Sequence, residues 1–356
     1  MSAGEKRYRA VAKTKASAGG MTMISVEQTV LRSDEVRVKV AAAGICGTDL
    51  AILKWPEWVA DRMKDHLPRV LGHEFCGYVC DVGSEVDPAW RNAYVAVESH
   101  LACGQCPLCL NGQEHICDNL KYVGIDFDGG FADYVAVPAT LLHRLPTTIP
   151  NQSAAALEAF ALATRAVLDE PVQEKSMLVT GLGPLGLMTM LIARARGAAS
   201  ITGVERNPHR VQIAKQVLES VPNTSVIDSS DPAVTSAVTQ HAGQSGFDRW
   251  IDWSGAGQAL GLGISALRRG GIAHLLASAE GPVELPLSRA LMKEISFRTI
   301  HGRNAEAWAV AVELLSSGMV DIRPLVTHCL PLTAYAEAFQ LLIDGKGCKV
   351  LMTPNA

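Results

Sequence analysis

Short apolar runs separated by polar turns dominate the first 150 residues. Apolar and polar positions alternate in residues 35–41 (EVRVKVA) and 93–97, and Gly, Pro, Asp and Ser residues lie between such runs. Residues 8–13 predict an opening strand of the same kind. A period of two is typical of strands with one face in a core, so this region predicts a β-rich domain of antiparallel strands.

Helical periodicity begins near residue 153 and alternates with short apolar runs up to about residue 300. Such alternation predicts a parallel sheet covered by helices. The expected helices are residues 153–168, 185–197 and 208–219, and the expected strands are residues 177–181, 200–205, 249–254 and 272–277.

The final segment contains two amphipathic helical windows, 305–316 and 334–342, and a closing strand at 349–352. We expect this segment to return to the first domain. The chain of 356 residues then divides into a β-rich domain, residues 1–153 and 300–356, and a helix–strand domain, residues 154–299.

The composition is that of a folded globular protein, with 48% hydrophobic and 19% charged residues. Lys and Arg number 32 against 36 Asp and Glu, and no block of like charge is long enough to follow a phosphate backbone. The most apolar stretch, residues 185–195, contains Arg194 and is shorter than the roughly 18 residues of a membrane span. We therefore expect neither a nucleic-acid nor a membrane partner.

Cysteine usage and the N-terminal segment point to a reducing cytoplasm. The nine cysteines are an odd number, and the first twenty residues lack the apolar core of a secretory signal. Metal binding explains five of these cysteines better than disulfides do. They are Cys46, Cys103, Cys106, Cys109 and Cys117.

A glycine-rich segment, residues 177–186 (MLVTGLGPLG), places G-x-G-x-x-G between an apolar strand and a helix. Gly181 permits a tight turn, Gly183 lets a pyrophosphate approach the backbone, and Gly186 lets the helix pack closely on the strand. The N-terminus of the following helix presents N–H groups to an anion. The segment predicts a dinucleotide site, although glycines can also serve a tight turn alone.

An acidic residue, Glu205, follows Gly186 by nineteen positions at the end of an expected strand. A carboxylate there can bind the ribose 2′-hydroxyl of NAD. Arg206 can instead pair with a 2′-phosphate, so NADP remains the less favoured alternative. The candidate cofactor residues are Gly181, Gly183, Pro184, Leu185, Gly186, Glu205, Arg206 and Arg210.

Four thiols within fifteen residues form the pattern Cys103-x2-Cys106-x2-Cys109-x7-Cys117. Four thiolates closing a tetrahedron are typical of a structural zinc, which has no open position for chemistry. An iron–sulfur cluster and a group of free thiols are the alternatives.

A second, dispersed set of ligands combines a thiol, an imidazole and a carboxylate. Cys46 lies in GICGTD, His73 and Glu74 in GHE, and Glu158 near the start of an expected helix. Three such ligands with an open fourth position make a catalytic zinc site. Taken singly, the same residues are also common as a buried thiol, a turn histidine and a helix N-terminal acid.

These motifs, together with residues 129–134 (GGFADY), have the order and spacing of the zinc-containing medium-chain alcohol dehydrogenases, which the chain resembles over nearly its whole length. Within that superfamily it is most similar to the L-threonine 3-dehydrogenase branch. The branch resemblance rests on residues 54–58 (KWPEW), 98–100 (ESH), His301-Gly-Arg303 followed by Trp308, and Thr327-His328.

The resemblance implies an α/β architecture, with a β-rich GroES-like catalytic domain and a doubly wound Rossmann domain. It also implies that Cys46, His73 and Glu158 bind a catalytic zinc, which Glu74 can approach as a further ligand. Asp49 would hydrogen-bond His73 and be anchored by Lys349. Thr48 would contact the substrate hydroxyl.

Several positions depart from the family pattern. Ala51 replaces the histidine that usually ends the proton relay, so water or another group must accept the proton. Leu53 and Cys348 stand where the threonine branch usually has Tyr and Gly. The expected polar substrate contacts, each equally explained as a surface charge, are Glu57, Glu98, His100 and Arg303.

The reaction implied is hydride transfer from a small secondary alcohol to NAD, with L-threonine as the first substrate considered. A polyol or another amino alcohol is the alternative within the same class. A non-catalytic zinc- and nucleotide-binding protein is the alternative from another class. The resemblance further implies two zinc ions per chain, one catalytic and one structural, and a homodimer or homotetramer.

Overall fold

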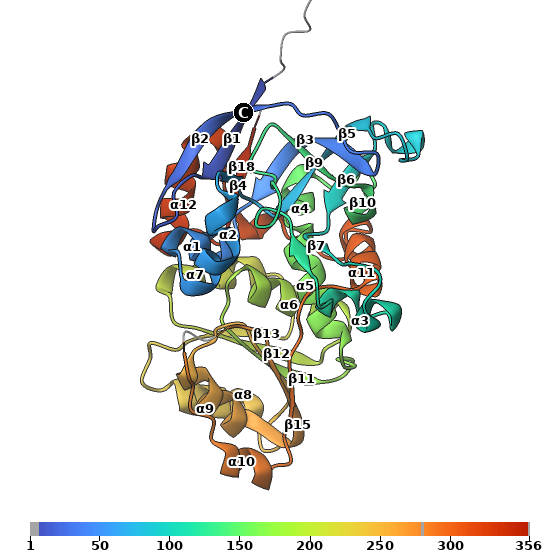
Figure 1. Ribbon diagram of the computed structural model, residues 1–356. Coiled ribbons are helices and arrows are strands. Elements are labelled where there is room, and N and C mark those ends of the chain that lie inside the picture. The colour runs from blue at the N-terminus through green and yellow to red at the C-terminus, as the bar shows by residue number, and fades with distance from the viewer. Residues whose placement is uncertain (1–6, 279–280, 355–356) are drawn as a thin grey trace, which may run out of the picture. The chain divides into compact units, whose positions relative to one another are not determined.

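The computed structural model describes residues 7–278 and 281–354. The chain forms two compact units (Figure 1). Unit 1 comprises residues 1–158 and 326–356, and unit 2 comprises residues 159–325, whereas the sequence pattern placed the divisions after residues 153 and 299. No helix in the described ranges is long and apolar enough to cross a membrane.

Unit 1 is the β-rich unit, and most of its strand pairs are antiparallel. A small sheet has the order β2-β1-β4, the main sheet has the order β10-β6-β5-β3-β18-β17 with β9 paired to β3, and β7 pairs with β8. These strands are β1 (Arg7–Lys13), β2 (Met21–Glu27), β3 (Glu35–Gly44), β4 (Arg69–Val70), β5 (Glu74–Val82), β6 (Tyr94–Val97), β7 (His100–Leu101), β8 (Lys121–Tyr122), β9 (Tyr134–Pro138), β10 (Leu142–Arg144), β17 (Val326–Pro331) and β18 (Lys349–Thr353).

Strand β3 is the centre of the main sheet, because β5, β9 and β18 all pair with it. Its apolar side chains Val36, Val38 and Val40 are fully buried in the core of unit 1. The strand ends at Gly44, which pairs with Glu74 of β5 and Leu351 of β18. The C-terminal strand is thereby brought to the point where β3 ends.

Short helices connect the strands of unit 1. They are α1 (Gly47–Lys54), α2 (Glu57–Met63), α3 (Pro107–Leu110), α4 (Asn151–Ala154) and α12 (Tyr335–Ile343), with single 3-10 turns at η1 (Lys64–His66), η2 (Pro88–Trp90), η3 (Glu114–Ile116), η4 (Ala139–Leu141) and η6 (Leu332–Ala334). The expected helix over 153–168 is two helices, α4 and α5, separated by a turn at residues 155–156.

Unit 2 contains a parallel sheet of order β13-β12-β11-β14-β15-β16. Numbered within the unit, this is the order 3-2-1-4-5-6 of the Rossmann fold. The strands are β11 (Ser176–Thr180), β12 (Ser200–Glu205), β13 (Thr224–Asp228), β14 (Phe247–Asp252), β15 (Leu267–Leu275) and β16 (Ser296–Arg298). The predicted α/β class with a Rossmann sheet and a separate β-rich GroES-like unit is confirmed.

The helices of unit 2 include three that the sequence pattern did not single out, α8, α9 and α10. The full set is α5 (Leu157–Leu168), which begins two residues before the unit does, α6 (Pro184–Ala195), α7 (Pro208–Leu218), α8 (Val234–Ala242), α9 (Gly257–Ala266), α10 (Leu287–Met292) and α11 (Ala305–Ser316), with a 3-10 turn at η5 (Arg323–Leu325).

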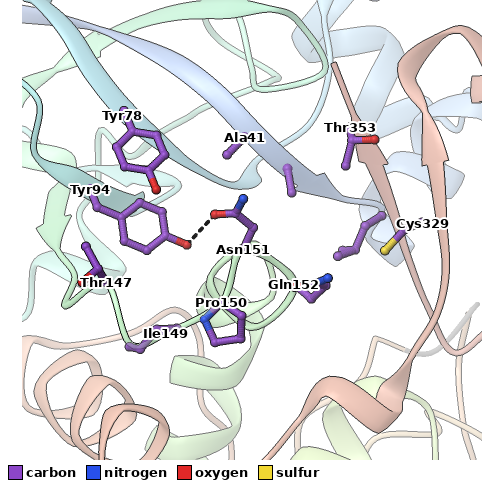
Figure 2. Close-up of a pocket in the computed structure, with 12 residues that line it drawn as sticks. Ala41, Tyr78, Tyr94, Thr147, Ile149, Pro150, Asn151, Gln152, Cys329 and Thr353 are labelled. Atoms are coloured by element: carbon purple, nitrogen blue, oxygen red, sulfur yellow. Dashed lines mark hydrogen bonds between the residues drawn. The ribbon is translucent and has the colours of Figure 1, made fainter. Parts of the chain in front are cut away.

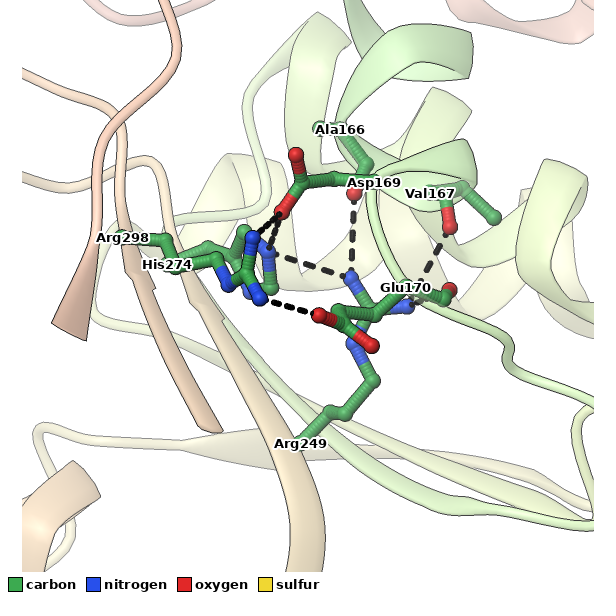
Figure 3. A network of polar contacts seen from close by, with 7 residues as sticks. All are labelled: Ala166, Val167, Asp169, Glu170, Arg249, His274 and Arg298. Atoms are coloured by element: carbon green, nitrogen blue, oxygen red, sulfur yellow. Dashed lines mark hydrogen bonds and ion pairs between the residues drawn. The ribbon is translucent and has the colours of Figure 1, made fainter. Parts of the chain in front are cut away.

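A buried arginine of β14 holds the C-terminal end of α5 (Figure 3). Arg249 is 1% exposed and donates to the carbonyl oxygens of Ala166, Val167 and Glu170. The last carbonyls of a helix lack partners within the helix, so the guanidinium satisfies them and fixes where α5 ends.

Candidate active site and metal centres

Three potential metal ligands converge where β3 ends. Cys46 is the N-cap of α1, His73 immediately precedes β5, and Glu74 is the first residue of β5. One donor atom from each lies within 4.8 Å of the others. His73 and Glu74 are buried, so a thiol, an imidazole and a carboxylate share a largely enclosed space.

Glu158, the third ligand implied by the family resemblance, is the second residue of α5 and is 6% exposed. It is not in the group whose donor atoms all lie within 4.8 Å. Burial lowers the pKa of His73, but the negative charges of Cys46, Asp49 and Glu158 outweigh burial and raise that pKa to about 10. Glu158 is therefore close enough to act electrostatically on the group.

Asp49 and Lys349 support this group in an arrangement that differs from the one the resemblance implied. Asp49 accepts a hydrogen bond from the backbone N–H of Cys46 at 2.8 Å. Lys349 forms an ion pair with Glu74 and donates to the carbonyl oxygen of Ile45 at 3.2 Å. The ammonium group is therefore anchored to Glu74, although its charge also lowers the pKa of Asp49 against the dominant effect of burial.

The arrangement fits a bound divalent cation. Oδ1 of Asp49 is buried, has no hydrogen-bond partner among the described residues, and lies 3.8 Å from Nδ1 of His73. An imidazole that binds metal through Nε2 turns its Nδ1–H toward such a carboxylate. A cation would also offset the clustered charge of the acids and the thiol, which protonated His73 and Lys349 otherwise oppose.

Other predicted catalytic residues lie on neighbouring elements of unit 1. Thr48 lies in the first turn of α1, with Oγ1 3.9 Å from the sulfur of Cys46. Ala51 lies three residues further along the same helix. His100 lies on β7, packs edge-to-face against Tyr122, and its backbone N–H donates to Glu98 at 3.0 Å.

Two more of the expected polar substrate contacts, Glu57 and Arg303, lie on different units. Glu57 is exposed at the start of α2. Arg303 lies in unit 2 and is 7% exposed. The substrate contacts therefore remain predictions at the level of individual residues.

The four thiols of the second motif form a compact group around α3. The distances between sulfurs are 3.5 Å for Cys106–Cys109, 3.8 Å for Cys106–Cys117 and 4.0 Å for Cys103–Cys109. Zinc–sulfur bonds of about 2.3 Å place the sulfurs of a tetrahedron about 3.8 Å apart. Backbone N–H groups of Cys103 and Asn119 also donate to the Cys117 sulfur. The group therefore has the dimensions of a four-thiolate zinc site.

The glycine-rich loop between β11 and α6 has the shape expected for a phosphate cradle. Gly181 has φ +84°, and a Cβ on Gly186 would lie 2.0 Å from the Gly181 carbonyl oxygen. At Gly183, in contrast, a Cβ would meet only Nη1 of Arg210, at 3.8 Å. Nε of Arg210 is buried and has no hydrogen-bond partner in the described part of the chain. The N-terminus of α6, which begins at Pro184 and Leu185, and a guanidinium therefore face an open backbone segment.

Glu205 is 7% exposed and accepts hydrogen bonds from backbone N–H groups, one of them in the glycine-rich loop. Its carboxylate accepts the N–H of Leu182 at 2.8 Å on one oxygen, and the N–H groups of Arg206 and Asn207 at 2.8 and 2.9 Å on the other. A carboxylate has about four acceptor positions, so these bonds leave room for a ribose hydroxyl. Arg206 is exposed beside it.

Unit 1 also contains a pocket of about 430 Å³ that the candidate metal ligands do not line (Figure 2). Tyr78 and Tyr94 stack on one side of it, with ring centroids 5.0 Å apart, and the Tyr94 hydroxyl donates to Asn151 at 2.9 Å. Its lining residues are uncharged and none is a predicted ligand or cofactor residue.

Sequence reasoning missed one contact of the metal group. Ser99 is 2% exposed, and its hydroxyl donates to Oε1 of Glu158 at 2.7 Å. Ser99 lies within the motif at residues 98–100, but only Glu98 and His100 of that motif were predicted as functional residues. No local pattern marks a serine that meets a helix 59 positions away.

Comparison with known proteins assigns the family. The model of the alcohol dehydrogenase GroES-like domain matches residues 32–147, and that of the zinc-binding dehydrogenases matches residues 184–317. The chain belongs to the zinc-containing medium-chain alcohol dehydrogenases and is a zinc-dependent alcohol oxidoreductase of the threonine dehydrogenase-like branch.

A curated relative supports the branch. The L-threonine 3-dehydrogenase of Bacillus subtilis is 35% identical over 343 residues, which is 96% of this chain and 97% of the relative. The family, the enzyme class and the branch predicted from the sequence are thus confirmed.

Solved structures share the fold over nearly the whole chain. A short-chain alcohol dehydrogenase of Escherichia coli CFT073 in complex with NADH is 26% identical, with a TM-score of 0.87, and the match covers 98% of this chain and all of the other. A zinc-binding dehydrogenase of Sinorhizobium meliloti bound to NADP is 27% identical, with a TM-score of 0.88 and the same coverage. Both kinds of nicotinamide cofactor therefore occur among structural relatives.

Proposed function

We propose that this protein oxidises the secondary alcohol of L-threonine with NAD. The hydride on the carbon that bears the hydroxyl passes to NAD, and the hydroxyl proton passes to solvent, which gives 2-amino-3-ketobutyrate and NADH. The observation that carries the proposal is the convergence of Cys46, His73 and Glu74, with Glu158 nearby, in a chain that is 35% identical to an L-threonine 3-dehydrogenase.

A catalytic zinc, when bound here, supplies a Lewis acid that lowers the pKa of the substrate hydroxyl toward neutrality. We assign its ligands as Cys46, His73 and Glu158, with Glu74 as a carboxylate within reach. Asp49 orients His73, and Thr48 accepts the hydrogen bond of the substrate hydroxyl. Because residue 51 is alanine, water receives the proton from Thr48.

The cofactor site is assigned to the glycine-rich loop of unit 2. The open backbone at Gly183, the N-terminus of α6 and the guanidinium of Arg210, whose Nε is buried, support binding of a pyrophosphate. The buried carboxylate of Glu205 supports NAD over NADP, because a 2′-phosphate close to it would be repelled.

A second, structural zinc is assigned to Cys103, Cys106, Cys109 and Cys117. The distances between their sulfurs support this assignment, and an iron–sulfur cluster is the alternative. The protein would then bind two zinc ions per chain.

A polyol or another amino alcohol is the second candidate substrate. Glu158 as a metal ligand suits it, because that acid resembles the sorbitol dehydrogenase arrangement. Leu53, which packs against the core of unit 1, and buried Cys348 also depart from the Tyr and Gly that the threonine branch usually has.

A substrate screen decides between these functions. NADH formation is followed with L-threonine, sorbitol, other polyols and simple secondary alcohols, with NAD and NADP side by side. The proposal requires the highest kcat/KM with L-threonine and NAD. A higher kcat/KM with a polyol would identify a polyol as the substrate in place of L-threonine. Protein that carries two zinc ions but turns over none of these alcohols would favour a non-catalytic role.

We also propose that the protein is a cytoplasmic homodimer or homotetramer. All nine cysteines lie in the described ranges and none of them is in a disulfide, which is typical of a reducing compartment. The edge strand β16 is exposed, and Leu291 and Met292 of α10 are 74% and 69% exposed, so a second copy of the chain can cover this edge. Light scattering of the wild type and of Leu291→Glu tests the assembly, with the variant expected to be smaller.

A further inference from the structure

Ser99 is fixed by its backbone beside the candidate metal group. It lies between β6, which ends at Val97, and β7, which begins at His100. The N–H of Val123 donates to its carbonyl oxygen at 2.9 Å, and the neighbouring N–H of Glu98 donates to the carbonyl of Leu141 at 2.8 Å. The Ser99 hydroxyl therefore belongs to a segment whose backbone is hydrogen-bonded to two other parts of unit 1.

The hydroxyl meets Glu158 in a buried environment. Ser99 and Glu158 are 2% and 6% exposed, and their oxygens are 2.7 Å apart. The distance is typical of a hydrogen bond from a hydroxyl to an ionised carboxylate. A glutamate side chain has several rotatable bonds, and this contact restricts the last of them.

Glu74, the other carboxylate near the metal group, is paired with the ammonium of Lys349, which competes with a cation for its negative charge. Ser99 donates a hydrogen bond to Oε1 of Glu158 and thereby orients that carboxylate.

We propose that Ser99 is a positioning residue for the catalytic metal site, which holds the Glu158 carboxylate in the orientation that binds the ion. The inference rests on the proposed function, because it assumes that Glu158 is a metal ligand. Partners that orient metal ligands typically change metal affinity about 10- to 100-fold when they are removed.

The test compares Ser99→Ala with Ser99→Thr, which restores a hydroxyl. Ser176→Ala is the matched control, because Ser176 also donates to a carboxylate, Asp248 at 3.0 Å, but in unit 2. Zinc affinity of both sites is measured by chelator competition, and the ligand set is followed by the absorption spectrum of the Co²⁺-substituted protein.

We expect Ser99→Ala to bind zinc about 10- to 100-fold more weakly at one site only, with an altered Co²⁺ spectrum. The zinc affinities of Ser99→Thr and Ser176→Ala are expected to stay within a few-fold of that of the wild type. Equal zinc affinity in Ser99→Ala and wild type would overturn the inference.

Two further readouts keep the result interpretable. If Ser99→Ala does not fold, Ser99→Cys, a weak donor of similar size, is compared with Ser99→Thr, and equal zinc affinity again overturns the inference. If the wild type binds a single zinc ion, the proposed function fails. If the wild type binds two and oxidises L-threonine while Ser99→Ala is unchanged, only the role of Ser99 fails.

Discussion

Lys349 and Glu74 form a buried ion pair across 275 positions of the chain. Their side chains are 2% and 1% exposed. The pair exists because Gly44, at the end of β3, pairs with both β5 and β18. The C-terminal strand therefore supplies a cation to the carboxylate beside His73, and the metal group depends on both ends of unit 1.

Removing this ammonium should destabilise the protein strongly. Lys349→Met leaves the Glu74 carboxylate buried without its partner, which typically costs about 3–5 kcal/mol. Lys346→Met is the control, since Lys346 is 58% exposed in its pair with Asp344 and should cost less than about 1 kcal/mol. Urea unfolding of both variants measures the difference, and similar stabilities would show that the buried pair does not stabilise unit 1.

Loss of one thiol from the four-cysteine group should release one zinc ion and destabilise its lobe. Cys109→Ser removes a buried sulfur from a site whose binding free energy contributes to folding. Metal analysis should fall from two zinc ions to one, and limited proteolysis should cut near residues 103–117. Cys329→Ser, at an exposed cysteine of unit 1, should retain both ions. An unchanged zinc content in Cys109→Ser would refute the structural site.

Protonation of His274 should make the protein less stable as the pH falls. Burial and the charge of Arg249 lower the pKa of His274 to about 4, although its contact with Asp169 opposes this shift (Figure 3). Because the unfolded pKa is about 6.5, the unfolded chain binds the proton first, and stability is lost as the pH falls from about 6.5 toward 4.

The variant His274→Gln isolates this contribution, since Gln can still donate to Asp169 but does not titrate. Between pH 7.5 and 5.0 the wild type should lose about 2 kcal/mol more than the variant in urea unfolding. Equal losses in both proteins would show that His274 titrates normally in the folded state.

Substitution of Glu205 should both weaken cofactor binding and destabilise the glycine-rich loop. Glu205→Ala removes the acceptor of the Leu182, Arg206 and Asn207 N–H groups, so we expect a lower melting temperature and NADH binding at least about 10-fold weaker. The ratio of NADP to NAD activity should also rise. Glu219→Ala, at an exposed acid after α7, is the control. An unchanged melting temperature together with an unchanged ratio of NADP to NAD activity would exclude Glu205 from the ribose site.

The sequence predicted the features that depend on local pattern. The glycine-rich loop, the four-cysteine spacing and the strands of the parallel sheet next to it are each contained in a short segment. The turn chemistry and periodicity that define them do not depend on distant contacts.

Contacts between distant segments were not predictable in the same way. The resemblance placed Lys349 beside Asp49, whereas the pairing of β18 with β3 brings it to Glu74. The contacts of Ser99 with Glu158 and of Arg249 with the end of α5 depend on how helices pack, and no periodicity in the sequence encodes them.

We propose that Cys46 binds a zinc ion that is required for oxidation of L-threonine. The most direct measurement is the zinc content and L-threonine-dependent NADH formation of Cys46→Ser, with Cys80→Ser at an exposed position as the control. We expect Cys46→Ser to contain one zinc ion per chain, to lose turnover by more than about 10³-fold and to bind NADH as the wild type does. Two zinc ions and normal turnover in that variant would contradict it.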